Sequence, residues 1–228
     1  MRKITFLVSL CIAVLLSGCT FNQQPDKTIQ ASQVPVEPGD KMKVHFINVG
    51  QGDSILVQSP DGKNLLVDGG TKDAGKDVVN YLRKHGVEKL DYVVATHPDA
   101  DHIGGLHSVL NSISIKNFVD SGKTHTSQTY EEMLQLILDK NIPFIVPKTG
   151  DTIPLDEELD ISVIHMGDKS ADNNEASIVL KLSYGETSFL LMGDADIRVE
   201  KDILENTNIK ATVLKAGHHG SDTSSSQD

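Results

Sequence analysis

Hydrophobic and polar positions alternate in short runs along most of the chain after residue 42, and a few segments instead show helical spacing. The apolar residues of these latter segments recur every three or four positions, which predicts helices at 76–86, 106–113, 129–141 and 197–206. Because strands and helices interleave, the pattern predicts an α/β layered fold. Alternating or continuous β-branched runs predict strands at 43–49, 54–59, 64–70, 91–96, 116–121, 143–147, 160–165, 177–185, 188–194 and 211–217.

Local signals mark where some of these elements begin and end. The segment 60–63, Pro-Asp-Gly-Lys, predicts a hairpin turn, because proline presets φ and glycine tolerates a positive φ. Gly86 is expected just beyond the C-terminus of the helix at 76–86. Thr129 and Glu132 fit a capping box at the start of the helix at 129–141.

The first residues differ from the rest of the chain. Arg2 and Lys3 precede an apolar run at 4–16 and then small residues, which is the layout of a secretory signal peptide at 1–18. The segment 16–19, Leu-Ser-Gly-Cys, resembles a bacterial lipobox and implies a lipidated Cys19. Residues 20–40 are polar, contain three prolines and show no periodicity, which predicts a flexible tether at 19–41 before a domain at 42–228. We therefore expect an extracytoplasmic protein that is lipid-anchored to the bacterial membrane; an ordinary N-terminal anchor and a soluble secreted protein are the alternatives.

Cysteine content and charge narrow the function classes. Cys11 would leave with the signal peptide and Cys19 would carry lipid, so the mature chain would have no disulfide. Removing Arg2 and Lys3 lowers the count of basic residues from 21 to 19 against 32 acidic residues, a net charge of −13. This charge argues against a broad basic surface for nucleic acid, although bound divalent ions can supply positive charge locally.

The segment 97–102, His-Pro-Asp-Ala-Asp-His, carries candidate metal chemistry at the end of the strand at 91–96. Histidine and aspartate together are ligands for first-row metal ions. His97 and Asp99, two residues apart in extended backbone, point to the same side and toward one ion, while Asp101 and His102 can reach a second. Oxygen ligands suit harder ions, so both Zn²⁺ and Mn²⁺ are candidates.

This segment resembles the histidine-rich motif of the metallo-β-lactamase superfamily, with Asp99 in place of a histidine. The segments 43–70, 96–105, 173–196 and 214–226 also resemble the metallohydrolase domain of ComEC-type competence proteins, in the same order. The resemblance implies a four-layered αββα sandwich with two divalent metal ions. It implies one ion on His97 and Asp99, another on Asp101 and His102, a bridging Asp194, a supporting Asp68, and one of His218 and His219 as a ligand or a substrate contact.

The chain departs from the superfamily pattern in three places. Asn173 and Asn174 stand where many members have a histidine; we expect Asn174, with Asp53, to support the metal shell, and His165 remains open as a substitute ligand. Asp99 makes the site richer in oxygen. The chain ends nine residues after His219, whereas relatives continue through further strands, a helix and another histidine, so we expect the C-terminal part of the sandwich to be missing.

Together these features predict a hydrolase. Two ions would lower the pKa of a shared water, which would attack a phosphodiester as metal-bound hydroxide, with Asp101, His218 and His219 as catalytic residues. DNA and an envelope polymer are the expected substrates, and no protein partner is predicted. The alternatives are a phosphorylcholine-type cell-envelope esterase, a non-catalytic accessory protein of DNA uptake or the envelope, and an inactive truncated product.

Overall fold

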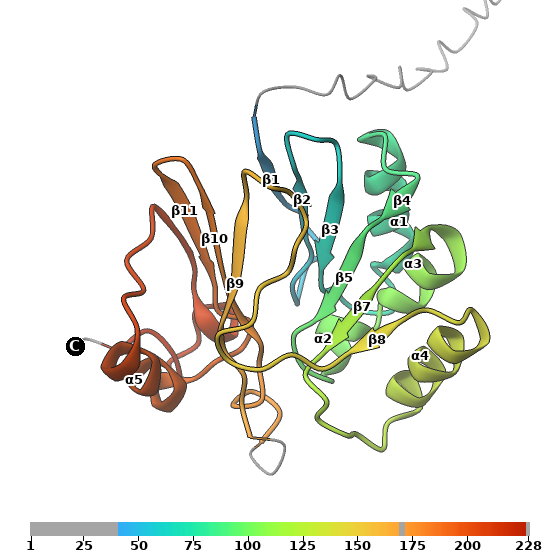
Figure 1. The fold of residues 1–228 in the computed structure, drawn as a ribbon. Helices are drawn as coiled ribbons and strands as arrows, with labels where there is room; N and C mark the ends of the chain where they lie inside the picture. Colours follow the sequence, from blue (N-terminus) through green and yellow to red (C-terminus); the bar gives the residue numbers. More distant parts are fainter. Residues whose placement is uncertain (1–40, 169–171, 227–228) are drawn as a thin grey trace, which may run out of the picture. The chain divides into compact units, whose positions relative to one another are not determined.

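The computed structural model describes residues 41–168 and 172–226. The expected signal peptide, Cys19 and nearly all of the expected tether lie outside these residues. Two sheets pack face to face, and helices cover the outer face of each (Figure 1). The expected α/β sandwich is therefore confirmed.

The first sheet has six strands. Its first three strands are antiparallel neighbours, and the remaining strands run parallel to the third. In spatial order the strands are β1 (Lys43–Phe46), β2 (Ile55–Gln58), β3 (Asn64–Val67), β5 (Tyr92–Ala95), β7 (Phe118–Asp120) and β8 (Phe144–Ile145).

The second sheet has four strands. Three of them form an antiparallel meander, and the fourth pairs in parallel with the last strand of the meander. In spatial order they are β12 (Val213–Lys215), β11 (Thr187–Leu191), β10 (Val179–Tyr184) and β9 (Asp160–His165). A separate two-stranded ladder joins β4 (Lys89–Leu90) to β6 (Ser114–Ile115).

Helices flank both sheets. On the first sheet lie α1 (Gly75–Lys84), α2 (Ala100–Ile103), α3 (Leu106–Ser112) and α4 (Gln128–Asp139), and on the second lies α5 (Ile197–Asn206). A short 3₁₀ turn, η1 (Gly217–Gly220), follows β12.

Alternation along the strands builds the layers. Leu56 of β2 faces the helices, whereas its neighbours Ile55 and Val57 face the second sheet. On β10, Leu180 faces the first sheet and Val179 faces α5. The described residues thus form three apolar clusters, one at each interface between adjacent layers, and burial of these clusters drives the layered arrangement.

Most predicted elements are present, with ends shifted by a few residues. The predicted capping box of α4 is wrong, because Ser127 caps this helix and its Oγ accepts a hydrogen bond from the Tyr130 backbone at 3.3 Å. The pattern also missed α2, β4 and β6, which are two to four residues long and too short to show a period. Gly86 adopts a positive φ just after α1, as expected.

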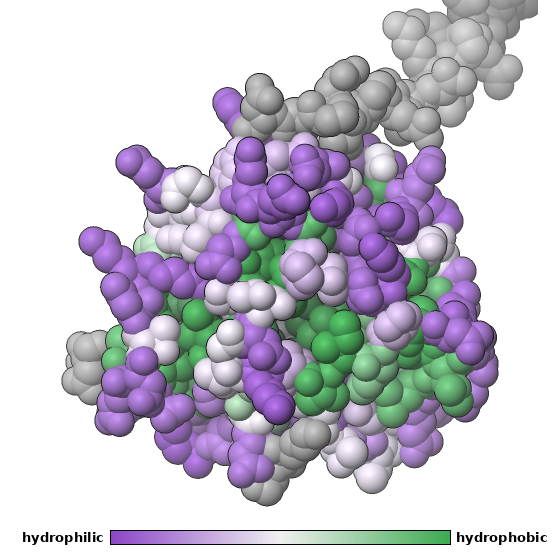
Figure 2. Space-filling view, in the orientation of Figure 1, coloured by the Kyte–Doolittle hydropathy of each residue, from purple (hydrophilic) through white to green (hydrophobic). Residues whose placement is uncertain are grey.

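The described surface combines polar and apolar regions. Figure 2 shows hydrophilic residues over most of the visible face with hydrophobic patches between them.

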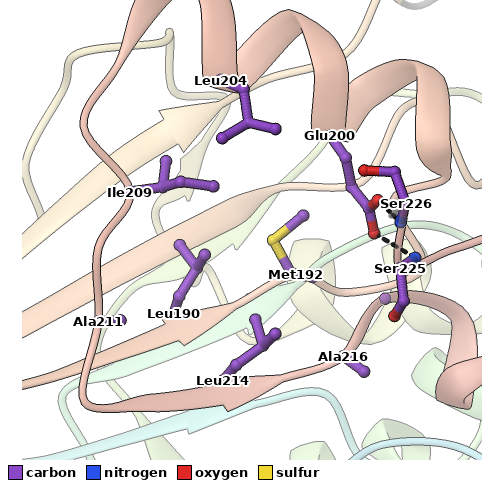
Figure 3. A pocket seen from close by; sticks show the side chains of 11 residues that line it. Leu190, Met192, Glu200, Leu204, Ile209, Ala211, Leu214, Ala216, Ser225 and Ser226 are labelled. Atoms are coloured by element: carbon purple, nitrogen blue, oxygen red, sulfur yellow. Dashed lines mark hydrogen bonds between the residues drawn. The ribbon is translucent and has the colours of Figure 1, made fainter. Parts of the chain in front are cut away.

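A pocket of about 320 Å³ lies between α5 and the sheet that carries β11 and β12 (Figure 3). Leu190, Met192 and Leu214 line it, and Leu214 is 59% exposed on the outermost strand of this sheet. No described helix is long and apolar enough to cross a membrane.

Candidate metal centre

The candidate ligands gather where several strands end. Asp68 directly follows β3, His97 follows β5, Asp194 follows β11, and His219 follows β12. The pairs β3–β5 and β11–β12 are both parallel, so the carboxyl ends within each pair lie at one edge of a sheet. Such an edge is the usual location of a site in α/β proteins.

His102 lies at the centre of this group and is fully buried. Its Nδ1 lies 2.8 Å from Oδ2 of Asp68, and its Nε2 lies 3.2 Å from Oδ1 of Asp194. Asp68 is held in turn by Thr96, whose backbone N–H and hydroxyl donate to the two carboxylate oxygens at 2.8 and 2.7 Å. Burial acts to lower the pKa of His102, but Asp68 and Asp194 outweigh it and raise this pKa to about 10.

His97 presents its Nε2 to two carboxylates. This atom lies 3.5 Å from Oδ2 of Asp99 and 3.8 Å from Oδ2 of Asp194, and the side chain is fully buried. The other ring nitrogen, Nδ1, lies 3.1 Å from the hydroxyl of Thr96 and 3.4 Å from that of Ser177. The hydroxyl groups therefore orient the ring, and Nε2 remains available to an ion.

Asp194 lies between His97 and His102. Burial acts to raise its pKa, but His102, His97 and His219 outweigh burial and hold the pKa well below its usual range. Its backbone N–H donates to the hydroxyl of Ser177 at 3.1 Å, which anchors the loop after β11. A carboxylate in this position can bridge two cations.

Asp99 is held from the opposite direction by Asn173. The Asn173 amide donates to Oδ1 of Asp99 at 2.6 Å, leaving Oδ2 toward His97. The contact with His97 lowers the pKa of Asp99 more than burial raises it, and Asn173 adds to the lowering. Asn173 therefore contacts one candidate ligand, Asp99, and the predicted Asn174 lies beside another, His218.

The two adjacent histidines lie in different surroundings. Nε2 of His219 lies 3.2 Å from Oδ2 of Asp194, 3.3 Å from Nε2 of His102 and 3.4 Å from Oδ2 of Asp101. His218 instead places its Nδ1 2.7 Å from the hydroxyl of Thr223 and 3.5 Å from the amide of Asn174. Both adopt a positive φ, of 42° and 54°, which is strained for a non-glycine residue and directs the two rings apart.

Two glycines let the loops of the centre meet. A Cβ on Gly105 would collide with the carbonyl of Gly69, and one on Gly52 would collide with the carbonyl of Asp101. The loop after β3 and the loop before β2 therefore press directly against the segment that carries Asp101 and His102.

Asp53 and Lys215 form an ion pair at the rim of the centre, and their side chains are 12% and 11% exposed. Lys215 also donates to the carbonyl of Gly193 at 2.8 Å and lies 3.8 Å from Oδ1 of Asp194. Burial raises the pKa of Asp53, and Lys215 opposes this rise. Nδ1 of His219 lies 3.6 Å from Oδ1 of the same carboxylate.

The residues present suit divalent cations. Asp53, His102, Asp194 and His219 each offer one ligand atom, and these four atoms lie within 4.8 Å of one another. Among the described residues, Nε2 of His97 and Oδ1 of Asp194 are buried atoms at this centre that make no well-formed hydrogen bond. Buried polar atoms are normally satisfied, so these two atoms and the mixed His/Asp donor set fit a metal ion.

The structure thus brings together Asp53, Asp68, His97, Asp99, Asp101, His102, Asp194 and His219. It places His165 elsewhere, with its Nδ1 3.6 Å from Asp202 of α5. Asn174 contacts His218.

The sequence did not predict that Thr96, Ser177, Asn173 and Lys215 contact the residues of the centre. Hydroxyl and amide residues are common at strand ends, so their types carry little signal. One feature of the sequence could have indicated that Lys215 lies at the centre: it ends the strand just before the two histidines.

Comparison with known proteins agrees with this geometry. The family model described as the metallo-beta-lactamase superfamily matches residues 47–228. ComE operon protein 3 of Bacillus subtilis is 29% identical over 205 residues, which cover 82% of this chain and 26% of that protein. Competence protein ComA of Neisseria gonorrhoeae is 29% identical over 194 residues, 83% of this chain and 25% of that protein. The chain therefore spans about a quarter of the length of these relatives.

Solved structures of low sequence identity resemble part of the chain. A Cronobacter sakazakii metallo-beta-lactamase with a HARLDQ motif has a TM-score of 0.48 and 14% identity, covering 66% of this chain and 59% of that one. The metallo-beta-lactamase fold protein YhfI from Bacillus subtilis has a TM-score of 0.44 and 15% identity, covering 67% and 59%. The match of the family model over most of the chain, from residue 47 onward, shows that this chain belongs to the metallo-β-lactamase superfamily.

Proposed function

We propose that the chain is a binuclear metal-dependent phosphodiesterase that works outside the cytoplasm on a lipid anchor at Cys19. The observation that carries the proposal is the position of Asp194, which lies within 4 Å of Nε2 of both His97 and His102. A shared carboxylate between two sets of ligands is the arrangement that two-metal hydrolases use.

The ligands divide into two sets around Asp194. His97 and Asp99 lie on one side, and His102, His219 and Asp101 on the other. Each set combines nitrogen and carboxylate oxygen, which both Zn²⁺ and Mn²⁺ accept. Divalent ions bound here would lower the pKa of a water molecule and neutralise the charge of a phosphate.

Neighbouring residues of the protein orient the candidate metal ligands. Asp68 holds Nδ1 of His102, and Thr96 and Ser177 hold Nδ1 of His97, so both rings present Nε2 to the centre. Asn173 fixes one oxygen of Asp99. This support matters because partners of metal ligands contribute 10- to 100-fold to metal affinity or activity.

The substrate follows from the charge of the centre and of the chain. A centre that gathers cations favours an anionic ester such as a phosphodiester. The names of the relatives, competence proteins and a recombination protein of Haemophilus influenzae, favour DNA. The net charge of −13 without residues 2 and 3 disfavours the many phosphate contacts that duplex binding needs, so we propose single-stranded DNA as the substrate.

The same charge favours a second candidate, a phosphorylcholine-type esterase of the cell envelope. A small zwitterionic headgroup needs no basic track beyond the centre, and an anchor at Cys19 would keep the enzyme beside the envelope. The phosphate chemistry is shared, and only the leaving group differs.

The experiment uses the purified full-length chain, reconstituted with Mn²⁺ or Zn²⁺. Hydrolysis of bis-p-nitrophenyl phosphate, single-stranded DNA and p-nitrophenyl phosphorylcholine is compared for the unchanged chain, Asp194→Asn and the control Asp160→Asn. Asp160 is exposed on β9, and its carboxylate accepts a hydrogen bond from the hydroxyl of Ser162 at 3.0 Å. We expect Asp194→Asn to lose at least about 100-fold in rate, since even supporting residues contribute up to that factor, and Asp160→Asn to retain full rate.

The pattern of substrates decides between the candidates. Cleavage of DNA supports the nuclease, and cleavage of p-nitrophenyl phosphorylcholine alone supports the esterase. If metal is bound and none of the three substrates is cleaved, the catalytic proposal fails in favour of a binding or accessory role. Lipid attachment is tested separately by mass spectrometry of the mature N-terminus, where an unmodified Cys19 or an uncleaved leader would contradict it.

A further inference from the structure

Lys215 is a largely buried cation that shares its partners with the candidate metal centre. Its ammonium group pairs with Asp53, donates a hydrogen bond to the carbonyl of Gly193 at 2.8 Å and lies 3.8 Å from Oδ1 of Asp194. Asp53 and Asp194 are also two of the four residues whose ligand atoms lie within 4.8 Å of one another. A lysine and a metal ion would therefore compete for the same two carboxylates.

The position of the ammonium group also determines what Asp53 can do. Oδ2 of Asp53 is taken by Lys215, and Oδ1 lies 3.6 Å from Nδ1 of His219. Lys215 holds Oδ2, and its positive charge repels a second cation, so Asp53 is a weaker metal ligand than an unpaired carboxylate would be. The ion nearest to Asp53 would then keep one coordination position open, which is what separates catalytic from purely structural metal sites.

The charge balance of the centre also favours a permanent cation at the position of Lys215. Asp53, Asp68, Asp99, Asp101 and Asp194 carry five negative charges, and two divalent ions would leave one of them unbalanced. The ammonium group of Lys215 supplies the remaining positive charge without using a metal coordination position. Buried charges are stable when they are paired, so a permanent cation suits this location.

We propose that Lys215 is a positioning residue that acts as a built-in cation of the metal centre. It withholds Asp53 from coordination, weakens the binding of the nearest ion by charge repulsion, and so preserves an open position for water or substrate. This inference rests on the proposed function, because it requires that divalent ions bind at the centre. It predicts an unusual combination: removing Lys215 tightens metal binding and slows hydrolysis.

The test is a double-mutant cycle on the full-length chain, using Lys215→Met, Asp53→Asn and the double variant Lys215→Met/Asp53→Asn. Apparent Kd values for Mn²⁺ and Zn²⁺ are measured by competition with a fluorescent chelator, beside kcat for bis-p-nitrophenyl phosphate. Lys181→Met is the matched control, since Lys181 also lies on a strand of the second sheet and donates to a backbone carbonyl, that of Asn208. Lys215→Arg tests rescue by a side chain that retains the charge.

We expect Lys215→Met to lower the Kd of the weaker-binding ion at least tenfold and to lower kcat. Asp53→Asn should raise this Kd, because it leaves the ammonium group unpaired beside the ion. The double variant should bind within about threefold of the unchanged chain, because it removes a neutral pair. Lys215→Arg and Lys181→Met should also stay within about threefold.

Two results would overturn the inference. One is weaker or unchanged metal binding in Lys215→Met with an unaltered melting temperature. The other is a double variant that binds as weakly as Asp53→Asn alone, which would make Asp53 a metal ligand; this comparison decides the matter even if Lys215→Met does not fold. Since Kd and kcat are separate readouts, tightened binding without any hydrolysis would contradict the proposed phosphodiesterase and leave the role of Lys215 intact.

Discussion

Oδ2 of Asp68 lies 2.8 Å from Nδ1 of His102, and this contact leaves Nε2 of the same ring facing Asp194 at 3.2 Å. Asp68 holds this place with a positive φ of 57°, which costs energy for a non-glycine residue. Thr96 fixes both of its carboxylate oxygens. A buried carboxylate behind a histidine fixes the tautomer of the ring and makes the outer nitrogen a better metal ligand.

The first prediction concerns this carboxylate. Asp68→Asn keeps the size of the side chain but removes the charge behind His102, so metal affinity should fall about 10- to 100-fold. Isothermal titration with Mn²⁺ or Zn²⁺ measures the change. Asp61→Asn, in the exposed hairpin turn between β2 and β3, is the control and should leave affinity unaltered; equal affinity of Asp68→Asn and the unchanged chain would contradict the supporting role.

The second prediction concerns the two adjacent histidines. His219→Ala should reduce metal affinity at least about tenfold, because His219 lies within 3.5 Å of Asp194, Asp101 and His102. His218→Ala should leave affinity nearly unchanged, because its Nδ1 is directed to Thr223. Metal titration of both variants checks the assignment, and a larger loss in His218→Ala would reverse it.

The third prediction concerns the choice of metal. Asp99 gives its side of the centre an oxygen ligand, positioned by Asn173. Asp99→His would exchange oxygen for imidazole nitrogen and should raise the preference for Zn²⁺ over Mn²⁺. Competition between the two ions, followed by elemental analysis, reports the ratio; a preference that does not move would show that Asp99 does not bind an ion.

The fourth prediction concerns the pH dependence of stability without metal. The pKa of His102 is raised from its ordinary value of 6.5 to about 10, so its protonated form is favoured in the folded state. This contribution to stability is fully present below about pH 6.5 and is lost as pH rises to about 10, with a slope of up to about 1.4 kcal/mol per pH unit. Urea denaturation of the metal-free chain between pH 6 and 10 measures the slope, and excess metal should reduce it, because an ion displaces the proton.

A flat stability profile over this range would contradict the fourth prediction. His107→Gln serves as its control, because His107 is half-buried on α3, hydrogen-bonds to Asn111 and contacts none of the candidate ligands. That variant should keep the slope of the unchanged chain.

The fifth prediction concerns the packing between the sheets. Leu180 of β10 is fully buried in the cluster between the two sheets, so Leu180→Ala should lower the free energy of unfolding by about 2–5 kcal/mol. Leu214→Ala on β12 is the matched control, because this leucine is 59% exposed and should cost less than about 1 kcal/mol. Similar losses in the two variants would contradict the layer assignment.

Local patterns were sufficient to predict much of the fold. The continuous apolar run of Ile55, Leu56 and Val57 indicates a strand with two buried faces, and such strands need layers on both sides. The capping of α4 by Ser127 was not predicted, because Thr129 and Glu132 offer the same local signal two residues later. Which of Ser127 and Thr129 caps the helix depends on the path by which the chain enters it.

In the metal centre, too, some residues could be predicted from the neighbouring sequence, and others depend on how distant segments meet in the fold. His97, Asp99, Asp101 and His102 could be predicted together because they lie within six residues at one strand end. The difference between His219 and His218 depends on two consecutive positive φ angles, which are uncommon for non-glycine residues even though histidine adopts them more often than most. The pairing of Lys215 with Asp53 depends on the sheets meeting at one edge, so it joins residues 162 positions apart that share no local pattern.

The central claim is that Asp194 joins two metal ions at this edge of the sheets. Elemental analysis of the purified full-length chain, after reconstitution with Mn²⁺ or Zn²⁺ and removal of free ions, tests it most directly beside Asp194→Ala and Asp160→Ala. We predict two ions per chain in the unchanged protein and in Asp160→Ala, and a loss of at least one in Asp194→Ala. The same metal content in all three proteins, or no bound ion in the unchanged chain, would contradict the account.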